Sequence, residues 1–160
     1  MSIFTTVATL FGGSGPNGED GDGDEPRPKP TVLVIDDDAK FLQTIRIVLG
    51  SAGYGVLTSS TGPKGLDMLR YAPRDVGVVL LDFDMPRFNG ADTLGHLRKL
   101  NERVKVIGMS GFNVNELPEN FQEGVERLVI KPFSNGELLQ TIEDVLRRNS
   151  VAEPAAAASA

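Results

Sequence analysis

The sequence predicts a three-layer α/β sandwich, in which helices cover both faces of a five-stranded parallel sheet. Apolar runs rich in β-branched residues alternate with stretches of helical spacing, and four of these runs end at a charged or hydroxyl residue: Val32–Ile35, Val76–Leu81, Val104–Met109 and Leu128–Ile130. Continuous apolar runs of this kind are typical of parallel strands buried on both faces. Because the carboxyl ends of parallel strands share one edge of the sheet, we expect the polar residues that follow the runs to meet there.

The composition predicts one packed domain between two flexible arms. The chain has 160 residues, which is enough for one domain of ordinary size. Residues 1–30 are rich in glycine, proline and acids, and residues 149–160 end in an alanine and serine tract. Such segments bury too little apolar surface to fold. The domain is therefore expected over residues 31–148.

The charge distribution argues against nucleic-acid binding. The formal net charge is −6, and residues 1–30 contribute −3 of it, because five acids stand against Arg27 and Lys29. No stretch concentrates lysine and arginine as a reader of the phosphate backbone would. The chain has no cysteine, which excludes disulfides and fits a reducing compartment. We find no export signal and no membrane span, so a cytoplasmic location is expected.

The first half of the domain is expected to hold two strand–helix pairs and a third strand. After the first strand, apolar residues at helical spacing predict a helix that glycines end. A short strand, a helix with proline in its first turn and a long apolar strand follow. These elements are marked in order by Phe41 to Leu49 with Gly50 and Gly53, by Tyr54–Ser59, by Thr61–Tyr71 with Pro63, and by Val76–Asp82.

The second half is expected to repeat the pattern with one weak helix. Ala91, Leu94 and Leu97 mark the third helix, before the strand Val104–Ser110. In the fourth helical segment, Asn113–Gly124, Pro118 removes a backbone hydrogen bond and clashes one turn back, so that this helix should be short or irregular. A fifth strand and a last helix complete the domain: Arg127–Lys131, then a capping box formed by Ser134 and Glu137.

Five such units favour right-handed crossovers and the flavodoxin-like strand order 2-1-3-4-5. That order places the ends of the first and third strands side by side, so Asp36, Asp37 and Asp82 should converge. The neighbouring Asp38 is assigned to capping of the first helix, and capping is also the alternative interpretation of Asp36 and Asp37.

Three carboxylates in one cleft repel one another unless some are protonated or a cation is bound. Carboxylate oxygens suit Mg²⁺, with Mn²⁺ as a second choice. A carboxylate beside such an ion can attack phosphorus and form an acyl phosphate. The transferred phosphoryl group is stabilised by the metal and by fixed donors. Ser110 and Lys131, at the ends of the fourth and fifth strands, are the available donors.

From about Thr31 to Arg148 the chain resembles the receiver domains of two-component response regulators. The resemblance rests on motifs that follow in order at the expected strand ends: Asp36-Asp37, the run Asp82-Phe83-Asp84-Met85-Pro86-Arg87-Phe88-Asn89-Gly90, Ser110-Gly111 and Lys131-Pro132-Phe133. Each motif alone is weak, whereas the ordered set is specific.

The resemblance implies a role for each residue of the site. Asp82 would accept a phosphoryl group from a histidine kinase or a phosphotransfer protein. Asp37 would bind Mg²⁺ directly, Asp36 directly or through water, and the backbone carbonyl of Asp84 would complete the metal shell. Ser110 would donate a hydrogen bond to the phosphoryl group, and Lys131 would pair with it. The Lys131-Pro132 peptide bond is expected to be cis.

The chain departs from the family pattern at the position of Leu128. This position usually carries an aromatic side chain that moves inward when the hydroxyl residue is drawn to the phosphate, so the usual switch is in doubt. Together with the proline-broken fourth helix, this alters the expected output and homodimer surface. The pair of a hydroxyl residue and a small residue, Ser110 and Gly111, does match the family pattern. Asp84 and Phe112 occupy positions that influence attack by water, and we expect Phe112 to shield the phosphoryl group.

The expected function is that of a stand-alone response regulator that signals to a downstream protein by contact. It would be a phosphoacceptor, with self-phosphorylation and autodephosphorylation as its only chemistry. One alternative is a non-phosphorylated interaction module on the same fold. Another is a phosphohydrolase of the haloacid dehalogenase type, but there the nucleophile strand precedes the acidic metal pair. Here Asp36 and Asp37 come before Asp82.

Overall fold

The computed structural model describes residues 29–71 and 76–148. The predicted arms, residues 1–30 and 149–160, lie outside the described residues except for Lys29 and Pro30. Neither the arms nor the domain boundary is therefore tested, and both stay predictions.

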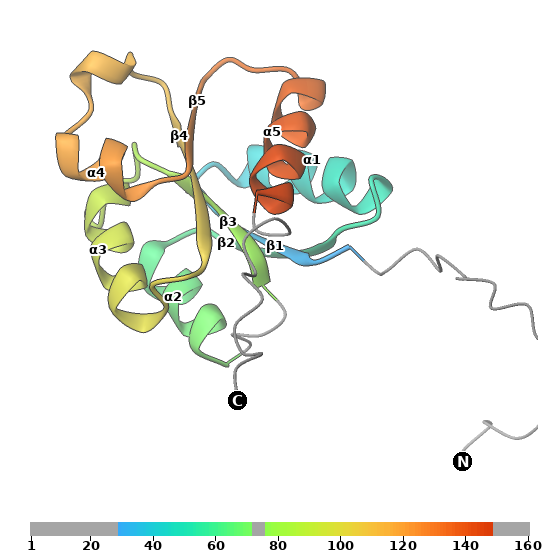
Figure 1. The fold of residues 1–160 in the computed structure, drawn as a ribbon, viewed down its shortest axis with the longest axis horizontal. Coiled ribbons are helices and arrows are strands. Elements are labelled where there is room, and N and C mark those ends of the chain that lie inside the picture. Colours follow the sequence, from blue (N-terminus) through green and yellow to red (C-terminus); the bar gives the residue numbers. More distant parts are fainter. Residues whose placement is uncertain (1–28, 72–75, 149–160) are drawn as a thin grey trace, which may run out of the picture.

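Within the described residues, five strands form one parallel sheet in the order β2-β1-β3-β4-β5, as predicted (Figure 1). The elements are, in chain order, β1 (Thr31–Ile35), α1 (Ala39–Ser51), β2 (Gly55–Ser59), α2 (Gly62–Tyr71), β3 (Val76–Asp82), α3 (Gly90–Leu100), β4 (Lys105–Ser110), the 3₁₀ turn η1 (Val114–Glu116), α4 (Glu119–Gly124), β5 (Arg127–Ile130) and α5 (Asn135–Arg147). None of the helices in these two ranges combines the length and apolarity needed to cross a bilayer.

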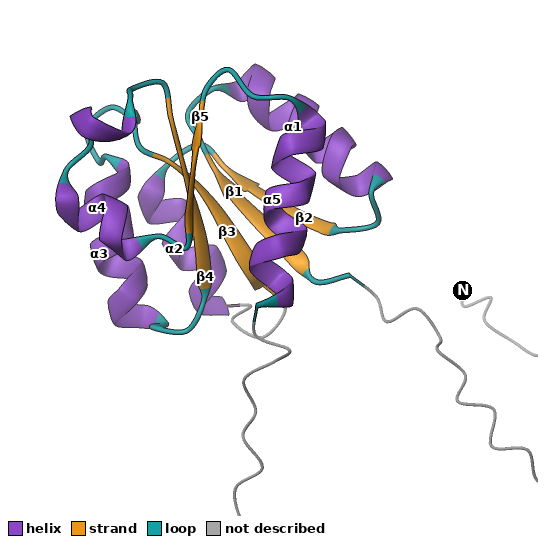
Figure 2. Cartoon of the chain, turned by 45° about the horizontal axis from the view of Figure 1, so that its top comes forward, coloured by secondary structure: helices purple, strands orange, loops and turns teal. Residues whose placement is uncertain are grey.

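Helices cover both faces of the sheet and enclose two apolar cores. Figure 2 shows α1 and α5 on one face, and α2, α3 and α4 on the other. Successive side chains of a strand point to opposite faces: Val32 and Val34 join the core beneath α1 and α5, whereas Leu33 and Ile35 join the other. This double burial explains why the strands read as unbroken apolar runs.

Two predicted helix caps are confirmed. The side chain of Asp38 accepts hydrogen bonds from the backbone N–H groups of Lys40 and Phe41 at the start of α1. Ser134 and Glu137 form the capping box of α5. The predicted stop at Gly50 and Gly53 agrees with the structure, because α1 ends between them, at Ser51. The turn that follows contains Gly53, whose φ of 87° suits a residue without a Cβ atom.

The segment before β5 is short and broken, as the proline predicted. Pro118 separates η1 from α4 and stands immediately before the first residue of α4. It tolerates this position because the first N–H groups of a helix have no partner within the helix. Only Phe121 of α4 is buried, so the helix is held to the domain chiefly through this one ring.

The strand register brings the predicted site together. Ile35 pairs with Leu81, so Asp36 and Asp82 end adjacent strands at the same level. Asp82 pairs with Met109, which places Ser110 one residue further along β4. Ser110 pairs with Ile130, and Lys131 follows directly.

We expect Gly90→Ala to lower the free energy of unfolding by about 2–3 kcal/mol. A Cβ atom there would lie 2.5 Å from the Asp82 carbonyl oxygen and 2.6 Å from Phe83 Cα. Both contacts are backbone atoms beside the site and cannot rotate away. Gly95→Ala, on the same helix with no atom within 4 Å, is the control and should gain up to about 1 kcal/mol. Equal urea-denaturation midpoints for the two variants would contradict the expectation.

Candidate functional site

Three carboxylates gather at the carboxyl edge of the sheet. Asp36, Asp37 and Asp82 each offer an oxygen, and these atoms lie within 4.8 Å of one another. Asp36 and Asp82 are 1% and 2% exposed, whereas Asp37 is exposed. Asp36 is further fixed by its Oδ1, which accepts the Asp38 backbone N–H at 2.8 Å. Asp36 and Asp82 are therefore shielded from solvent, whereas Asp37 faces it.

Lys131 bridges the two buried carboxylates. Its Nζ donates to Asp36 Oδ2 and to Asp82 Oδ1, each at 2.8 Å, and lies 5.1 Å from the centre of the Phe41 ring. The preceding backbone bond, from Lys131 N to Ser110 O at 2.7 Å, holds the end of β5 against β4. The Lys131-Pro132 peptide bond is cis, as predicted.

Burial and neighbouring charge shift the titration of this pair. Burial raises the pKa of Asp82 to about 6, and the carboxylates of Asp36 and Asp84 add to the effect, while the Lys131 ammonium opposes it. Burial lowers the pKa of Lys131, but its hydrogen bonds to Asp36 and Asp82 outweigh that effect and leave the pKa raised. The site thus favours the charged form of Lys131 and disfavours the ionised form of Asp82.

The donor set fits a small divalent cation. Hard oxygen ligands and excess negative charge are what Mg²⁺ requires, and it commonly uses one or two carboxylates together with waters. Asp82 Oδ2 accepts no hydrogen bond within the described residues, and the Asp37 carboxylate faces solvent. Both remain available as ligands.

Ser110 and Gly111 lie beside the cluster, but they contact Asp84. Asp84 Oδ2 accepts hydrogen bonds from Gly111 N at 2.7 Å and from Ser110 Oγ at 3.2 Å. The sequence analysis assigned two roles to Asp84, a backbone carbonyl in the metal shell and an influence on attack by water, and both stay predictions. The hydrogen bonds of its side chain were missed, because no periodicity indicates where a loop carboxylate points.

Phe112 directly follows Gly111 in the loop after β4. The residue is 50% exposed, and its ring meets Phe83 edge-on, with ring centres 6.4 Å apart. Phe83 in turn lies 5.0 Å from the ring of Phe121 in α4. Three aromatic rings therefore connect the loop after β4 with α4, a feature that the sequence analysis missed.

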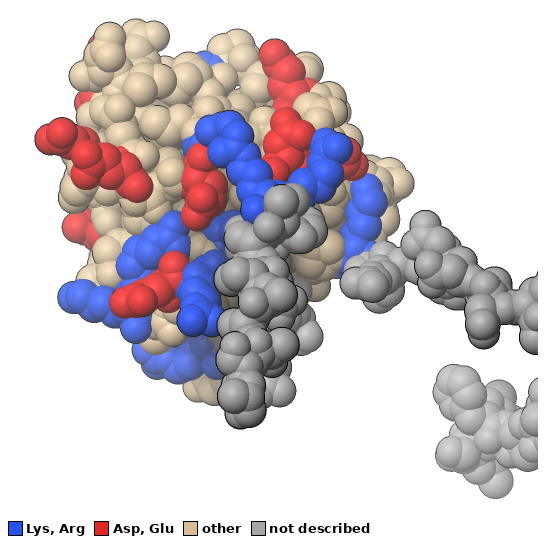
Figure 3. All heavy atoms as spheres, in the orientation of Figure 1, with Lys and Arg blue, Asp and Glu red and all other residues tan. Residues whose placement is uncertain are grey.

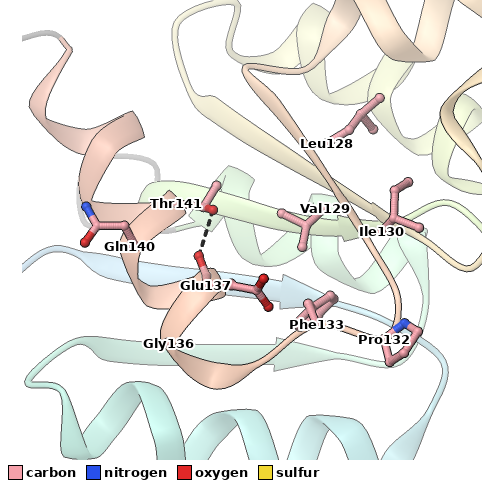
Figure 4. Close-up of a pocket in the computed structure, with 9 residues that line it drawn as sticks. All are labelled: Leu128, Val129, Ile130, Pro132, Phe133, Gly136, Glu137, Gln140 and Thr141. Carbon is pink, nitrogen blue, oxygen red and sulfur yellow. Dashed lines mark hydrogen bonds between the residues drawn. The ribbon is translucent and has the colours of Figure 1, made fainter.

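Leu128, at the predicted switch position, packs against the core that contains Phe121. A Cβ atom on Gly108 would lie 2.8 Å from Leu128 Cδ2 and 2.9 Å from Phe121 Cε1. Figure 4 shows Leu128 on β5, at one end of a groove of about 600 Å³ between β5 and α5. The absence of a β-carbon at Gly108 thus lets Leu128 and Phe121 approach the sheet.

Comparison with known proteins agrees with this geometry. The model of the response regulator receiver domain matches residues 32–143. The transcriptional regulatory protein KdpE of Mycobacterium tuberculosis is 35% identical over 121 residues, covering 76% of this chain and 53% of that protein. The cell cycle transcriptional regulator CtrA of Caulobacter vibrioides is 32% identical over 120 residues, covering 74% and 51%. The chain thus spans about half the length of these relatives.

A solved structure shows the same fold. The response regulator receiver domain protein of Clostridium thermocellum superimposes with a TM-score of 0.71 at 27% identity, covering 78% of this chain and 99% of that one. Three observations point to the same family. They are the five-stranded parallel sheet, the acidic cluster at its carboxyl edge, and the match of the family model to residues 32–143. The chain therefore belongs to the response regulator receiver domain family, the phosphoacceptor module of two-component signalling.

Proposed function

We propose that the chain accepts a phosphoryl group on Asp82 from the phosphohistidine of a kinase or a phosphotransfer protein. The observation that carries the proposal is the setting of Asp82. This buried carboxylate has one oxygen fixed by Lys131, and it lies within 4.8 Å of the Asp36 and Asp37 oxygens.

The reaction assigns a separate task to each side chain. Asp82 is the nucleophile, and one of its two carboxylate oxygens attacks phosphorus. As the new O–P bond forms, the bond from phosphorus to the donor nitrogen breaks and its electron pair stays on the imidazole. Lys131 holds Asp82 Oδ1 in place and offers its charge to the incoming phosphoryl oxygens.

Asp36, Asp37 and Asp82, with the backbone carbonyl of Asp84, are the proposed ligands of Mg²⁺, or of Mn²⁺ in its place. When bound, this ion supplies positive charge that offsets the repulsion between carboxylates and phosphoryl oxygens. A hollow of about 530 Å³ opens beside Asp37, between the start of α2 and the loop Met85 to Phe88. It leaves this side of the cluster accessible.

Incubation with acetyl phosphate and Mg²⁺, followed by intact-protein mass spectrometry, tests the proposal. We expect one phosphate on the wild type and none on Asp82→Asn. Asp38→Asn is the matched control, because Asp38 is a neighbouring exposed carboxylate whose side chain caps α1, and it should retain the phosphate. A phosphate that persists on Asp82→Asn would move the acceptor to another residue.

We expect Phe112→Ala to shorten the lifetime of the phosphoryl group, by about three- to tenfold if the ring slows the approach of water. The measurement is loss of phosphate over time after removal of the donor. Val114→Ala removes another exposed apolar side chain from the same loop and is the control. An unchanged lifetime in Phe112→Ala would remove the shielding role.

For the output, we propose a contact with a downstream protein or a second copy of the chain. The groove between β5 and α5 offers Val129 and Ile130 beside the polar Glu137, Gln140 and Thr141 (Figure 4). A mixed polar and apolar surface of this kind suits a protein partner. On the face shown in Figure 3, acidic side chains lie among the basic ones. Such a mixture favours a protein over the phosphate backbone of a nucleic acid.

A further inference from the structure

The Asp84 carboxylate binds two donors that lie beside Asp82. Its Oδ2 accepts Gly111 N at 2.7 Å and Ser110 Oγ at 3.2 Å. Hydrogen bonds to a carboxylate are stronger than those to a neutral acceptor. Asp84 thereby joins the loop after β3 to the loop after β4.

These bonds use up the donor capacity of both groups. A serine hydroxyl has one hydrogen to donate, as does a backbone amide. Ser110 Oγ already accepts the Phe112 backbone N–H at 2.9 Å, so its remaining role in this arrangement is to donate to Asp84. While the contact persists, neither donor is free to bind a phosphoryl oxygen on Asp82.

We propose that Asp84 is a positioning residue that holds the resting arrangement by competing with the phosphoryl group for Ser110 and Gly111. The inference rests on the proposed function. Phosphorylation adds negative charge and new acceptor oxygens on Asp82, beside the two donors that Asp84 occupies. The phosphoryl group therefore has to displace Asp84 from both donors, and release of Asp84 accompanies activation.

The released loop has a physical connection to α4. Phe112 follows Gly111 directly, and its ring lies edge-on against Phe83. Phe83 contacts Phe121, the fully buried side chain of α4. Movement of Ser110 and Gly111 toward Asp82 pulls on the Phe112 backbone and shifts its ring on Phe83. In this chain, which has Leu128 at the usual aromatic position, the rings thus couple the site to α4.

Beryllofluoride with Mg²⁺, a mimic of the phosphoryl group, tests the competition. We expect Asp84→Ala to bind it about tenfold more tightly than the wild type, since a charge-assisted bond no longer has to be broken. Asp84→Asn keeps an acceptor without the charge and should fall between the two. Both variants retain the backbone carbonyl. Asp92→Asn, which neutralises an exposed carboxylate in the first turn of α3, is the control and should leave the affinity unchanged.

A second readout reports the resting contact without metal or phosphate. The amide proton of Gly111 is expected far downfield in the nuclear magnetic resonance spectrum of the wild type, because it donates to a carboxylate. It should move upfield in Asp84→Ala, and in the wild type it should respond to beryllofluoride. A Gly111 resonance that is the same in wild type and Asp84→Ala would overturn the proposal.

A double-mutant cycle separates competition from simple charge repulsion. In the Ser110→Ala background the hydroxyl is gone, so Asp84→Ala should tighten beryllofluoride binding by a smaller factor than in the wild type. An equal factor in the two backgrounds would assign the effect to charge repulsion and overturn the proposed competition for Ser110 and Gly111. A wild type that binds no beryllofluoride would instead overturn the proposed function, whatever the Gly111 resonance shows.

Discussion

Lys131→Met is expected to lower the free energy of unfolding by about 2–3 kcal/mol at neutral pH without divalent cations. The variant leaves the carboxylates of Asp36 and Asp82 buried at the sheet edge without the ammonium that bridges them at 2.8 Å on each side. Methionine keeps most of the side-chain volume, so the loss reports charge more than packing. Urea denaturation monitored by circular dichroism measures it.

The loss should depend on pH in a defined direction. As the pH falls, protonation of Asp82 removes part of the uncompensated charge, and the deficit of Lys131→Met should shrink. Because Lys131 lowers the pKa of Asp82, the variant should take up this proton at a higher pH than the wild type, whose Asp82 has a pKa of about 6. Lys99→Met, which removes an exposed ammonium at the end of α3, is the control and should change stability by less than about 0.5 kcal/mol. A deficit of equal size at every pH would assign the effect to packing.

The same variant should also lose most of its phosphoryl uptake. Removal of one fixed donor to a transferring group typically costs about a hundredfold or more in rate. The rate of phosphate incorporation from acetyl phosphate at saturating Mg²⁺ measures this loss. A normal rate together with the stability loss would limit Lys131 to a structural role.

The architecture and the convergence of the acids could be predicted because they depend on strand order and register alone. Once β1 and β3 are neighbours, the residues that follow their last apolar positions must lie side by side, so Asp36 and Asp82 needed no side-chain information. The interruption of the helical segment before β5 could also be predicted, because it depends on local sequence alone. Pro118 disrupts a helix whatever the rest of the chain does.

Contacts that depend on side-chain direction could not be predicted. Lys105 occupies the first position of β4, and its Nζ reaches the carbonyls of Val145 and Leu146 at the end of α5. Arg98 joins α3 to the carbonyl of Gly124 at the end of α4. The Asp84 carboxylate belongs to the same class, because its partners are 26 and 27 residues away. Nothing in a single sequence specifies such distances.

Asp82→Asn is expected to stabilise the metal-free protein by about 1–3 kcal/mol at neutral pH. The folded state raises the pKa of Asp82 from 3.8 to about 6, so between these values it holds a proton that the unfolded chain releases. Its contribution to stability is therefore largest at low pH and is lost as the pH rises through 6. The amide carries no charge, so this loss should vanish in the variant, and the two unfolding curves should converge near pH 4.

Magnesium should act in the opposite direction on the same pair of proteins. A cation that binds only the folded state stabilises it in proportion to its affinity, and the wild type offers three carboxylates where Asp82→Asn offers two. Titration with MgCl₂ at neutral pH should therefore raise the melting temperature of the wild type more than that of Asp82→Asn. The difference in melting temperature between the two proteins should become smaller. The destabilising charge of Asp82 would then be the feature that makes the site bind metal. An equal rise in both proteins would place the ion away from Asp82.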